Sequence, residues 1–228
     1  MTTGGGAEGP GHGESPVAGL GDLPLHVAAR GRGPPILLLH GYAASAHSFR
    51  HWVPELALDH QAIPVDLKGF GAAPGPDDGR YSPVDLAGPV VELIRRLDLR
   101  DLTLVGHSLG GGLALVAALG LLDRGELDRL RGLVSVSGAA YAQPLPPFAR
   151  LARWPRASRV GLALVPKGWL VRRVLVSIVH DPGSVDREQV EGYAAPLRNP
   201  ESHRPLLEAA RQIVPPELPA LTARYPEL

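Results

Sequence analysis

The sequence predicts an α/β fold: a doubly wound, mostly parallel sheet with a helical insertion. Short, uninterrupted apolar runs recur, for example at 36–39 and 102–105, and such runs are typical of strands covered on both faces. Amphipathic helical patterns separate these runs, which implies right-handed crossovers between parallel strands. After Tyr141 the apolar runs stop and prolines divide the chain into short helical patterns. This change predicts an all-helical insertion over the sheet.

Composition narrows the classes of function. The 228 residues suit one domain, and 44% hydrophobic and 20% charged residues are ordinary globular values. A net charge of zero gives no support for binding nucleic acid or an acidic membrane surface. The chain has no cysteine, so it has neither disulfides nor thiolate metal ligands. We expect a small-molecule substrate and no metal or cofactor, and we leave the oligomeric state open.

Changes in composition and residue pattern divide the chain into four regions. Residues 1–21 are glycine-rich and predict a flexible tail; they lack the basic start and apolar stretch of a secretory signal, so a cytoplasmic protein is expected. Residues 22–141 form the predicted core, 142–213 a helical cap, and 214–228 a return segment towards the core. The apolar segment 160–179 contains three cations and is interpreted as a buried or pocket-lining helix, not a membrane span.

The first half of the core begins with an alternating strand pattern at 23–29, followed by the buried strand at 36–39. Ser45 is predicted to cap a helix with one apolar face. A second buried strand at 62–65 runs into Asp66. The predicted apolar face of the helix consists of Phe49, Trp52, Val53 and Leu56.

The second half of the core repeats this alternation. Ser82-Pro83, a cap followed by proline at the first helical position, predicts a helix start. After the strand at 102–105 a helix is expected to run to Leu122, and 133–137 predicts another buried strand. The carboxyl ends of parallel strands are where ligands bind in such sheets. His40, Asp66, Ser108 and Gly138 all stand at these ends.

The most specific stretch is Gly106-His107-Ser108-Leu109-Gly110, which joins a predicted strand to a predicted helix. In a G-x-S-x-G turn the serine takes a strained backbone conformation, and a side chain two residues before or after it would collide with neighbouring backbone. Glycine is therefore needed at 106 and 110. The turn lifts the Ser108 hydroxyl out of the sheet edge and points the N–H of Leu109 to where an oxyanion would form.

With these pieces placed, the chain resembles the α/β-hydrolase fold superfamily in its cap-bearing form. Three motifs in order carry the resemblance: His40-Gly41, Asp66-x-x-Gly69-x-Gly71 and the turn at 106–110. The resemblance implies that Ser108 is the nucleophile and that the backbone N–H groups of Tyr42 and Leu109 form the oxyanion hole. His40, Gly41, Gly106, His107 and Gly110 are then supporting residues of the turns, and Asp66 braces its own turn.

The resemblance also implies a triad in the order Ser, acid, His, with the acid and the histidine on two later strands. Residues 221–228 resemble the helix that leads up to the first of those strands. The expectation is therefore a core that is incomplete at its C-terminal side, without the triad acid and histidine. Its sheet would have an unprotected edge after Val136.

Two other histidines follow Ser108. His180-Asp181 is interpreted as a helix end, where a histidine suits the dipole and Asp181-Pro182-Gly183 stops the helix. His203, between Ser202 and Arg204, is interpreted as part of a solvated face. Neither is expected to serve as the base.

The leading hypothesis is a serine hydrolase that cleaves a small or medium, mainly apolar ester, thioester or activated C–C bond through an acyl-enzyme, and that is impaired without its acid and histidine. Acyl transfer is a variant of it. A serine at 108 argues against epoxide hydrolase or dehalogenase chemistry, which the resemblance assigns to a carboxylate nucleophile. The alternative is a non-catalytic fragment or binding protein. Apolar cap side chains fit either a hydrophobic substrate or core packing: Trp154, Leu162, Trp169, Leu170 and Val174.

Overall fold

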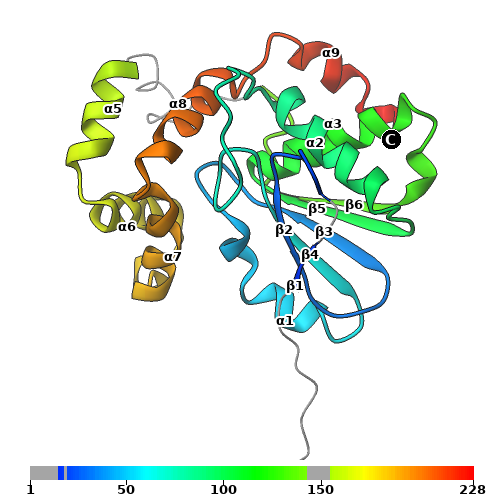
Figure 1. Cartoon of the computed structure of the whole chain (residues 1–228), viewed down its shortest axis with the longest axis horizontal. Helices are drawn as coiled ribbons and strands as arrows, with labels where there is room; N and C mark the ends of the chain where they lie inside the picture. The colour runs from blue at the N-terminus through cyan, green and yellow to red at the C-terminus, as the bar shows by residue number, and fades with distance from the viewer. Residues whose placement is uncertain (1–14, 18–19, 143–154) are drawn as a thin grey trace, which may run out of the picture.

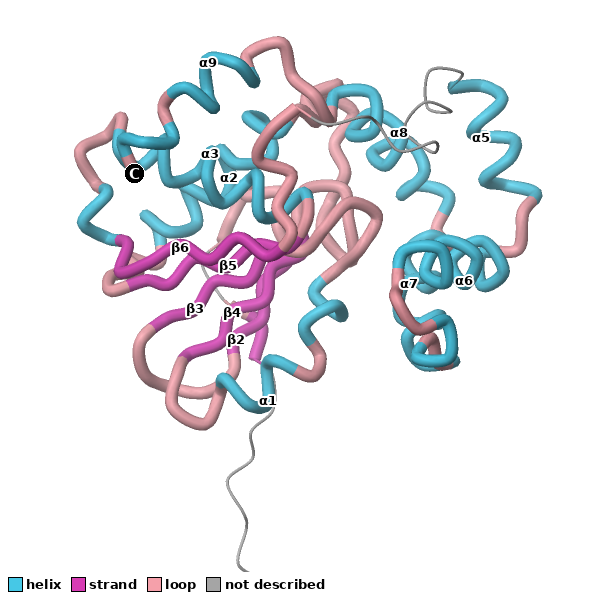
Figure 2. The backbone as a smooth tube through the Cα atoms, turned by 180° about the vertical axis from the view of Figure 1, so that it is seen from behind, coloured by secondary structure: helices cyan, strands magenta, loops and turns pink. Residues whose placement is uncertain are grey.

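The computed structural model describes residues 15–17, 20–142 and 155–228. They build one six-stranded sheet in the order β1-β2-β4-β3-β5-β6. Helices cover the two faces of the sheet, and a group of helices from the second half of the chain stands beside it (Figures 1 and 2). The predicted α/β sheet with a helical addition is therefore confirmed.

Four adjacent parallel strands form the larger part of the sheet. These are β3 (Pro35–Leu39), β4 (Gln61–Asp66), β5 (Leu102–His107) and β6 (Leu130–Val136). Leu37 on β3 lies opposite Ile63 on β4 and Leu104 on β5, and all three are almost fully buried. Successive side chains of β3 alternate between the two faces of the sheet, as strand geometry requires. Because both faces are covered, the whole run is apolar.

Two antiparallel strands extend the sheet beyond β4. β2 (His26–Ala29) pairs with β4, and β1 (Ser15–Pro16) pairs with β2. The prediction of a flexible tail reaching Gly21 is therefore wrong for residues 15–17, because the edge of β2 offers their backbone hydrogen-bond partners, including the bond from Val17 N–H to Val27 O at 3.1 Å. Residues 1–14 and 18–19 of the predicted tail lie outside the described residues.

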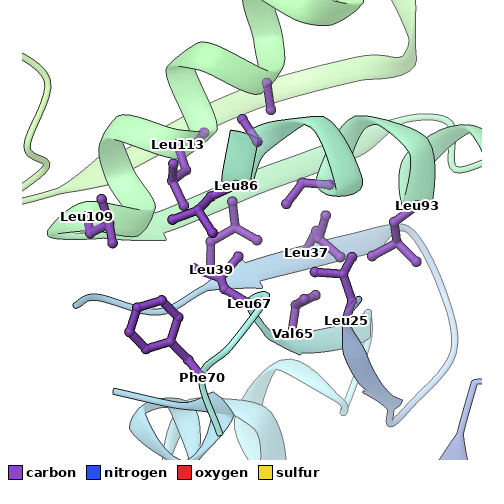
Figure 3. Packing of buried hydrophobic residues seen from close by; sticks show 14 of the residues in the cluster. Leu25, Leu37, Leu39, Val65, Leu67, Phe70, Leu86, Leu93, Leu109 and Leu113 are labelled. Atoms are coloured by element: carbon purple, nitrogen blue, oxygen red, sulfur yellow. The ribbon is translucent and has the colours of Figure 1, made fainter. Parts of the chain in front are cut away.

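The main core lies between the sheet and two helices, α2 (Pro83–Arg96) and α3 (Leu109–Leu122). Figure 3 shows Leu37 and Leu39 of β3 meeting Leu86 of α2 and Leu113 of α3. On the opposite face, η1 (Ala46–Phe49) and α1 (Trp52–Leu56) cover a smaller cluster. That cluster contains Ile36, Leu38, Phe49, Val53, Ala62 and Val105.

The start of α2 is the predicted capping motif. The Ser82 hydroxyl accepts the Asp85 N–H at 3.2 Å, and the Asp85 carboxylate accepts the Ser82 N–H at 3.3 Å. Both partners come from the same four residues, so the sequence alone specifies them. The predicted cap is confirmed.

The prediction that Ser45 caps a helix is wrong. Ser45 makes no capping hydrogen bond, and the first N–H of η1, that of Ala46, binds the Asp66 carboxylate instead. The predicted helix also breaks between Phe49 and Trp52, which shifts the phase of its apolar face. Phe49 and Val53 are buried, whereas Trp52 is 45% exposed.

β6 is the last strand of the sheet and pairs only with β5 among the described residues. It begins three residues earlier than predicted, at Leu130, and Val134 near its end is exposed. The prediction of a buried strand here is wrong: every residue of β6 is exposed or only partly buried, because no further strand covers its outer side in the described residues. The prediction of an open sheet edge at this strand is confirmed within the same residues.

The helical unit, residues 155–212, contains α5 (Pro155–Leu164), α6 (Lys167–Ile178), α7 (Arg187–Leu197) and α8 (His203–Gln212), with short turns η3 (Pro182–Ser184) and η4 (Pro200–Ser202). The predicted helices at 169–180, 186–197 and 201–213 are confirmed within their end residues. The predicted start of the cap at 143–154, with Trp154, lies outside the described residues.

The single buried helix expected over 160–179 is wrong. Pro166 separates α5 from α6, because proline ends one helix and starts the next. Trp169 and Ile178 are more than half exposed. In the described ranges, no helix has the length and apolar character needed to cross a membrane.

The C-terminal segment folds back onto the core as α9 (Leu218–Ala223) and η5 (Tyr225–Glu227). The Tyr225 hydroxyl donates to the carbonyl oxygen of Ala140 at 3.0 Å, beyond the end of β6. Arg224 pairs with Asp123, the residue directly after α3. From there the chain passes through the η2 turn (Leu127–Arg129) into β6. Residues 214–228 therefore lie beside the β5–β6 side of the sheet (Figure 1).

Candidate active site

Ser108 occupies the turn between β5 and α3 in a conformation that L-residues rarely adopt, with φ of 53° and ψ of −118°. Its backbone is held at both ends: the N–H donates to Val136 O at 3.0 Å, and the carbonyl oxygen accepts the N–H of Ala139 at 2.9 Å and of Gly111 at 3.0 Å. This network fixes a strained residue between two strands and a helix. The predicted strained turn is confirmed.

Gly106 and Gly110 are required by close backbone contacts. A Cβ built on Gly106 would lie 2.1 Å from Gly110 O, and one on Gly110 would lie 2.1 Å from Leu39 O. Any side chain at either position would therefore push α3 away from β5 and β3. The steric reason predicted for these glycines is confirmed.

The loop after β3 touches this turn. A Cβ on Gly41 would lie 3.2 Å from the Ser108 Cβ and 3.4 Å from His107 Nδ1. Tyr42 follows Gly41 directly, and Leu109 is the first residue of α3, where an amide has no acceptor within the helix. The residues predicted to supply the two N–H groups are therefore brought together beside Ser108.

His40 is fully buried and bridges the ends of β3 and β4. Its Nε2 accepts the Leu67 N–H at 3.1 Å, so Nδ1 carries the proton and donates to Gly41 O at 2.8 Å. Burial lowers the pKa of the imidazole, against the opposing influence of the Gly41 bond and of Asp66. The ring is neutral, and both of its nitrogens are hydrogen-bonded to backbone groups. His40 therefore fixes the conformation of the loop after β3, as the resemblance implies for a supporting residue.

Asp66 has a larger role than bracing its own turn. One carboxylate oxygen accepts Ala72 N–H at 2.9 Å within the loop after β4, and the other accepts Ala46 N–H at 2.7 Å from the loop after β3. Gly71 allows this approach, because a Cβ there would overlap the carboxylate. The loops that follow β3 and β4 are thus joined through one buried side chain.

His107 is exposed and lies next to Gly41. Partial burial lowers the pKa of its ring. Among the described residues, no histidine or carboxylate forms a hydrogen bond with the Ser108 hydroxyl. The structure therefore brings Ser108, Leu109 and the loop that carries Tyr42 close together, and no base is hydrogen-bonded to Ser108 among the described residues.

The two histidines that follow Ser108 in the chain, His180 and His203, lie in different environments. His180 is exposed just beyond the end of α6, and Asp181 accepts Gly183 N–H at 2.8 Å in the next turn, as expected of a helix stop. The prediction of a solvated face for His203 is wrong: it is 7% exposed, and its Nε2 donates to Leu197 O at 2.9 Å. A ring nitrogen used in this way links α7 to α8.

The helical unit is attached to the loops that follow β3 and β4, a set of contacts that sequence reasoning missed. The Tyr42 hydroxyl donates to Leu206 O on α8 at 2.9 Å. Arg204 pairs with Asp77, and the Gln212 amide binds Tyr81 N–H at 3.1 Å and Gly79 O at 3.0 Å. These partners are more than a hundred residues apart, so no local signal in the sequence points to them.

A polar cleft of about 640 Å³ lies between the same two regions. Its walls are the 69–77 loop and the segment around 199–205, and Ser108 does not line it. In the part of the chain that the structure describes, no group of three or more His, Asp or Glu side chains could hold a metal ion.

Comparison with known proteins agrees with this geometry. Residues 34–170 match the model of a protein family described as the alpha/beta hydrolase fold. The chain belongs to this family. The match includes β3 to β6 and the turn at Ser108, which are the parts of the α/β-hydrolase fold described above.

Related sequences carry hydrolase names. An uncharacterized hydrolase of Bacillus subtilis, YugF, is 30% identical over 72% of this chain and 58% of its own length. A haloalkane dehalogenase of Mesorhizobium japonicum is 30% identical over 82% of this chain and 60% of its own length. The chain thus spans less than two thirds of the length of these two relatives.

Solved structures show the same fold. An α/β-hydrolase fold protein from Burkholderia ambifaria superposes with a TM-score of 0.74 at 24% identity, covering 88% of this chain and 72% of that one. A laboratory-evolved variant of potato epoxide hydrolase also reaches 0.74, at 21% identity, covering 94% and 77%. At these identities the likeness concerns the fold alone.

Proposed function

We propose that this chain carries the nucleophile and oxyanion side of a serine hydrolase site. The observation that supports it best is the backbone of Ser108, which has a φ of 53° in a strand–helix turn that Gly106 and Gly110 alone permit. Such a turn presents a hydroxyl at the carboxyl edge of the sheet, where α/β-hydrolases carry their nucleophile. The close approach of Gly41 to Ser108 supports an oxyanion hole to which the loop after β3 contributes.

The proposed reaction is acyl transfer to water. The Ser108 Oγ adds to the carbonyl carbon of an ester or thioester, and the electron pair moves to the carbonyl oxygen, where Tyr42 and Leu109 donate their N–H groups. The Ser108 proton passes to water, the carbonyl group re-forms, and the bond to the leaving group breaks as that group takes a proton from water. Water then attacks the acyl-enzyme, releasing the acid and restoring the serine hydroxyl.

Proton transfer is the incomplete part of the proposed site. The described residues offer no base for the Ser108 hydroxyl, and loss of the base leaves about 10³- to 10⁴-fold acceleration over water from the oxyanion hole and binding. The 228-residue chain is therefore proposed to be a slow hydrolase.

The proposed substrate is small or medium and mainly apolar. Residues 142–213 would form the cap over the site, and the exposed side chains of Trp169 and Val174 give α6 apolar surface for such a substrate. Relatives include proteins named epoxide hydrolase and haloalkane dehalogenase. A hydroxyl at position 108, in place of a carboxylate, favours acyl chemistry over these two reactions.

The test is hydrolysis of p-nitrophenyl butyrate by the wild type, Ser108→Ala and a matched serine control, Ser177→Ala on the surface of α6. We expect slow turnover, far below the roughly 1–10³ s⁻¹ typical of enzymes, which Ser108→Ala abolishes and Ser177→Ala retains. Equal rates in the wild type and Ser108→Ala would overturn the proposal. Serine-dependent turnover at ordinary enzyme rates would show that the chain supplies its own base.

A second candidate is a protein that binds an apolar ligand without turnover, and the absence of a base hydrogen-bonded to Ser108 within the described residues favours it. Binding of p-nitrophenyl butyrate or its product acid, measured by calorimetry, with no Ser108-dependent hydrolysis would support this candidate in place of the first.

A further inference from the structure

The side chain of Tyr42 connects two parts of the molecule that the proposed mechanism uses separately. Its hydroxyl donates to the carbonyl oxygen of Leu206 on α8, while its backbone follows Gly41 in the loop beside Ser108. These residues are 164 positions apart in the sequence. One residue therefore belongs to the oxyanion loop by its backbone and to the helical unit by its side chain.

The ring of Tyr42 is also held in place, by packing contacts. It packs edge-on against Phe70 with ring centroids 6.1 Å apart, and Phe70 in turn packs edge-on against His40 at 5.7 Å. On α8 the ring lies against Leu207 and Ala210. Burial raises the pKa of the Tyr42 hydroxyl, so it remains a protonated donor throughout the physiological range.

The loop that carries Tyr42 needs such an anchor. Ala43, the next residue, has a φ of 56°, a left-handed conformation that a residue with a Cβ adopts only under constraint. On the other side of Tyr42, Gly41 O accepts both the His40 ring at 2.8 Å and Ala44 N–H at 3.3 Å. The Tyr42 amide thus lies in a tight turn that is fixed by His40 from the core and by Leu206 from α8.

We infer that the Tyr42 side chain is a positioning group through which docking of α8 sets the direction of the oxyanion-hole N–H. This inference rests on the proposed function for its catalytic consequence, whereas the mechanical coupling of α8 to residues 41–46 stands on the contacts alone. When α8 is docked, the tyrosine holds the loop in the strained conformation. When α8 moves away, the loop loses the anchor that α8 supplies and keeps those from His40 and Asp66.

The matched pair of variants is Tyr42→Phe and Tyr225→Phe. Each removes one hydroxyl from a part-buried tyrosine that donates to a distant carbonyl oxygen, at 2.9 Å to Leu206 and at 3.0 Å to Ala140. Only the first bond joins the helical unit to the loop beside Ser108. A general loss of stability affects both variants alike, and a positioning role affects Tyr42→Phe alone.

The coupling is tested by hydrogen exchange. Amides of residues 41–46 and of α8 should exchange several-fold faster in Tyr42→Phe than in the wild type, while Tyr225→Phe leaves both segments unchanged. Unchanged exchange at 41–46 in Tyr42→Phe would overturn the coupling.

The catalytic consequence is tested with phenylboronic acid, in which boron bonds to a serine oxygen, the serine proton passes to water, and the tetrahedral anion occupies the oxyanion hole. We expect Tyr42→Phe to bind it at least about fivefold more weakly, with Tyr225→Phe equal to the wild type. Equal binding by all three would overturn the positioning role. Wild-type binding no tighter than that of Ser108→Ala would instead overturn the proposed function, whatever the exchange data show.

Discussion

The carboxylate of Asp66 accepts the N–H of Ala46 through one oxygen at 2.7 Å and that of Ala72 through the other at 2.9 Å. Asp66 is 5% exposed, so neither amide has ready access to water as a replacement partner. Asp66 consequently joins two loops at the carboxyl edge of the sheet, in addition to the bond from Leu67 N–H to His40 Nε2.

Replacing Asp66 by asparagine should destabilise the fold. The amide can accept only one of the two N–H groups and turns a donor towards the other, which costs about 1–3 kcal/mol for an unsatisfied buried group. Urea denaturation of Asp66→Asn measures the loss. Asp59→Asn, at an exposed carboxylate beside His60, is the control, and a loss no larger than that of the control would contradict a bridging role.

His40 should make stability depend on pH. Burial lowers its pKa in the folded state from the ordinary 6.5, so the folded protein keeps the ring neutral while the unfolded chain takes up a proton. Unfolding is therefore favoured as the pH falls below about 6.5, with a slope of up to about 1.4 kcal/mol per pH unit for one group. Unfolding free energies between pH 5 and 8 should show a shallower slope in His40→Gln, whose amide oxygen can still accept Leu67 N–H. The exposed His180→Gln serves as the control; equal slopes in all three proteins would exclude His40 as the source.

Two glycine substitutions should act in opposite directions. Gly110→Ala places a methyl group 2.1 Å from Leu39 O, whereas a Cβ at Gly161 on α5 meets nothing within 4 Å. We expect Gly110→Ala to cost about 3 kcal/mol or more, and Gly161→Ala to gain about 0.5–1 kcal/mol from the higher helix propensity of alanine. Thermal unfolding of both variants measures this; a Gly110→Ala protein as stable as the wild type would mean that α3 can move away from β3 at little cost.

Gln212 should be needed to hold α8 against the loop after β4. Its oxygen accepts Tyr81 N–H and its nitrogen donates to Gly79 O. Glutamate at this position keeps the bond to Tyr81 N–H but cannot donate to Gly79 O. Because that second bond is exposed, we expect a loss of about 0.5–1.5 kcal/mol. Limited proteolysis should then cut the 73–80 loop faster in Gln212→Glu. Proteolysis at the wild-type rate would show that Arg204 holds the loop by itself.

Features decided by neighbouring residues could be predicted from the sequence, and features decided by distant ones could not. The Ser82 cap and Gly106 depend on residues within a few positions, so their local patterns are sufficient, whereas Gly110 is required by Leu39 O on another strand and is predicted only through the turn motif to which it belongs. Ser45 looks the same as Ser82 locally, but Asp66, twenty residues later, takes the N–H that Ser45 was expected to cap. The burial of His203 has the same cause, because its partner Leu197 lies across a turn on another helix.

The backbone of Ser108 makes four hydrogen bonds, to Val136, Gly111, Gly112 and Ala139, while its hydroxyl bonds to no side chain in the described residues. The conformation of the turn is thus independent of the chemical group that it carries. A different side chain at this position would be presented in the same place at the same angle, without any change to the strands or to α3. The turn therefore fixes where the side chain at position 108 is presented, and the chemistry available there depends on which side chain that is.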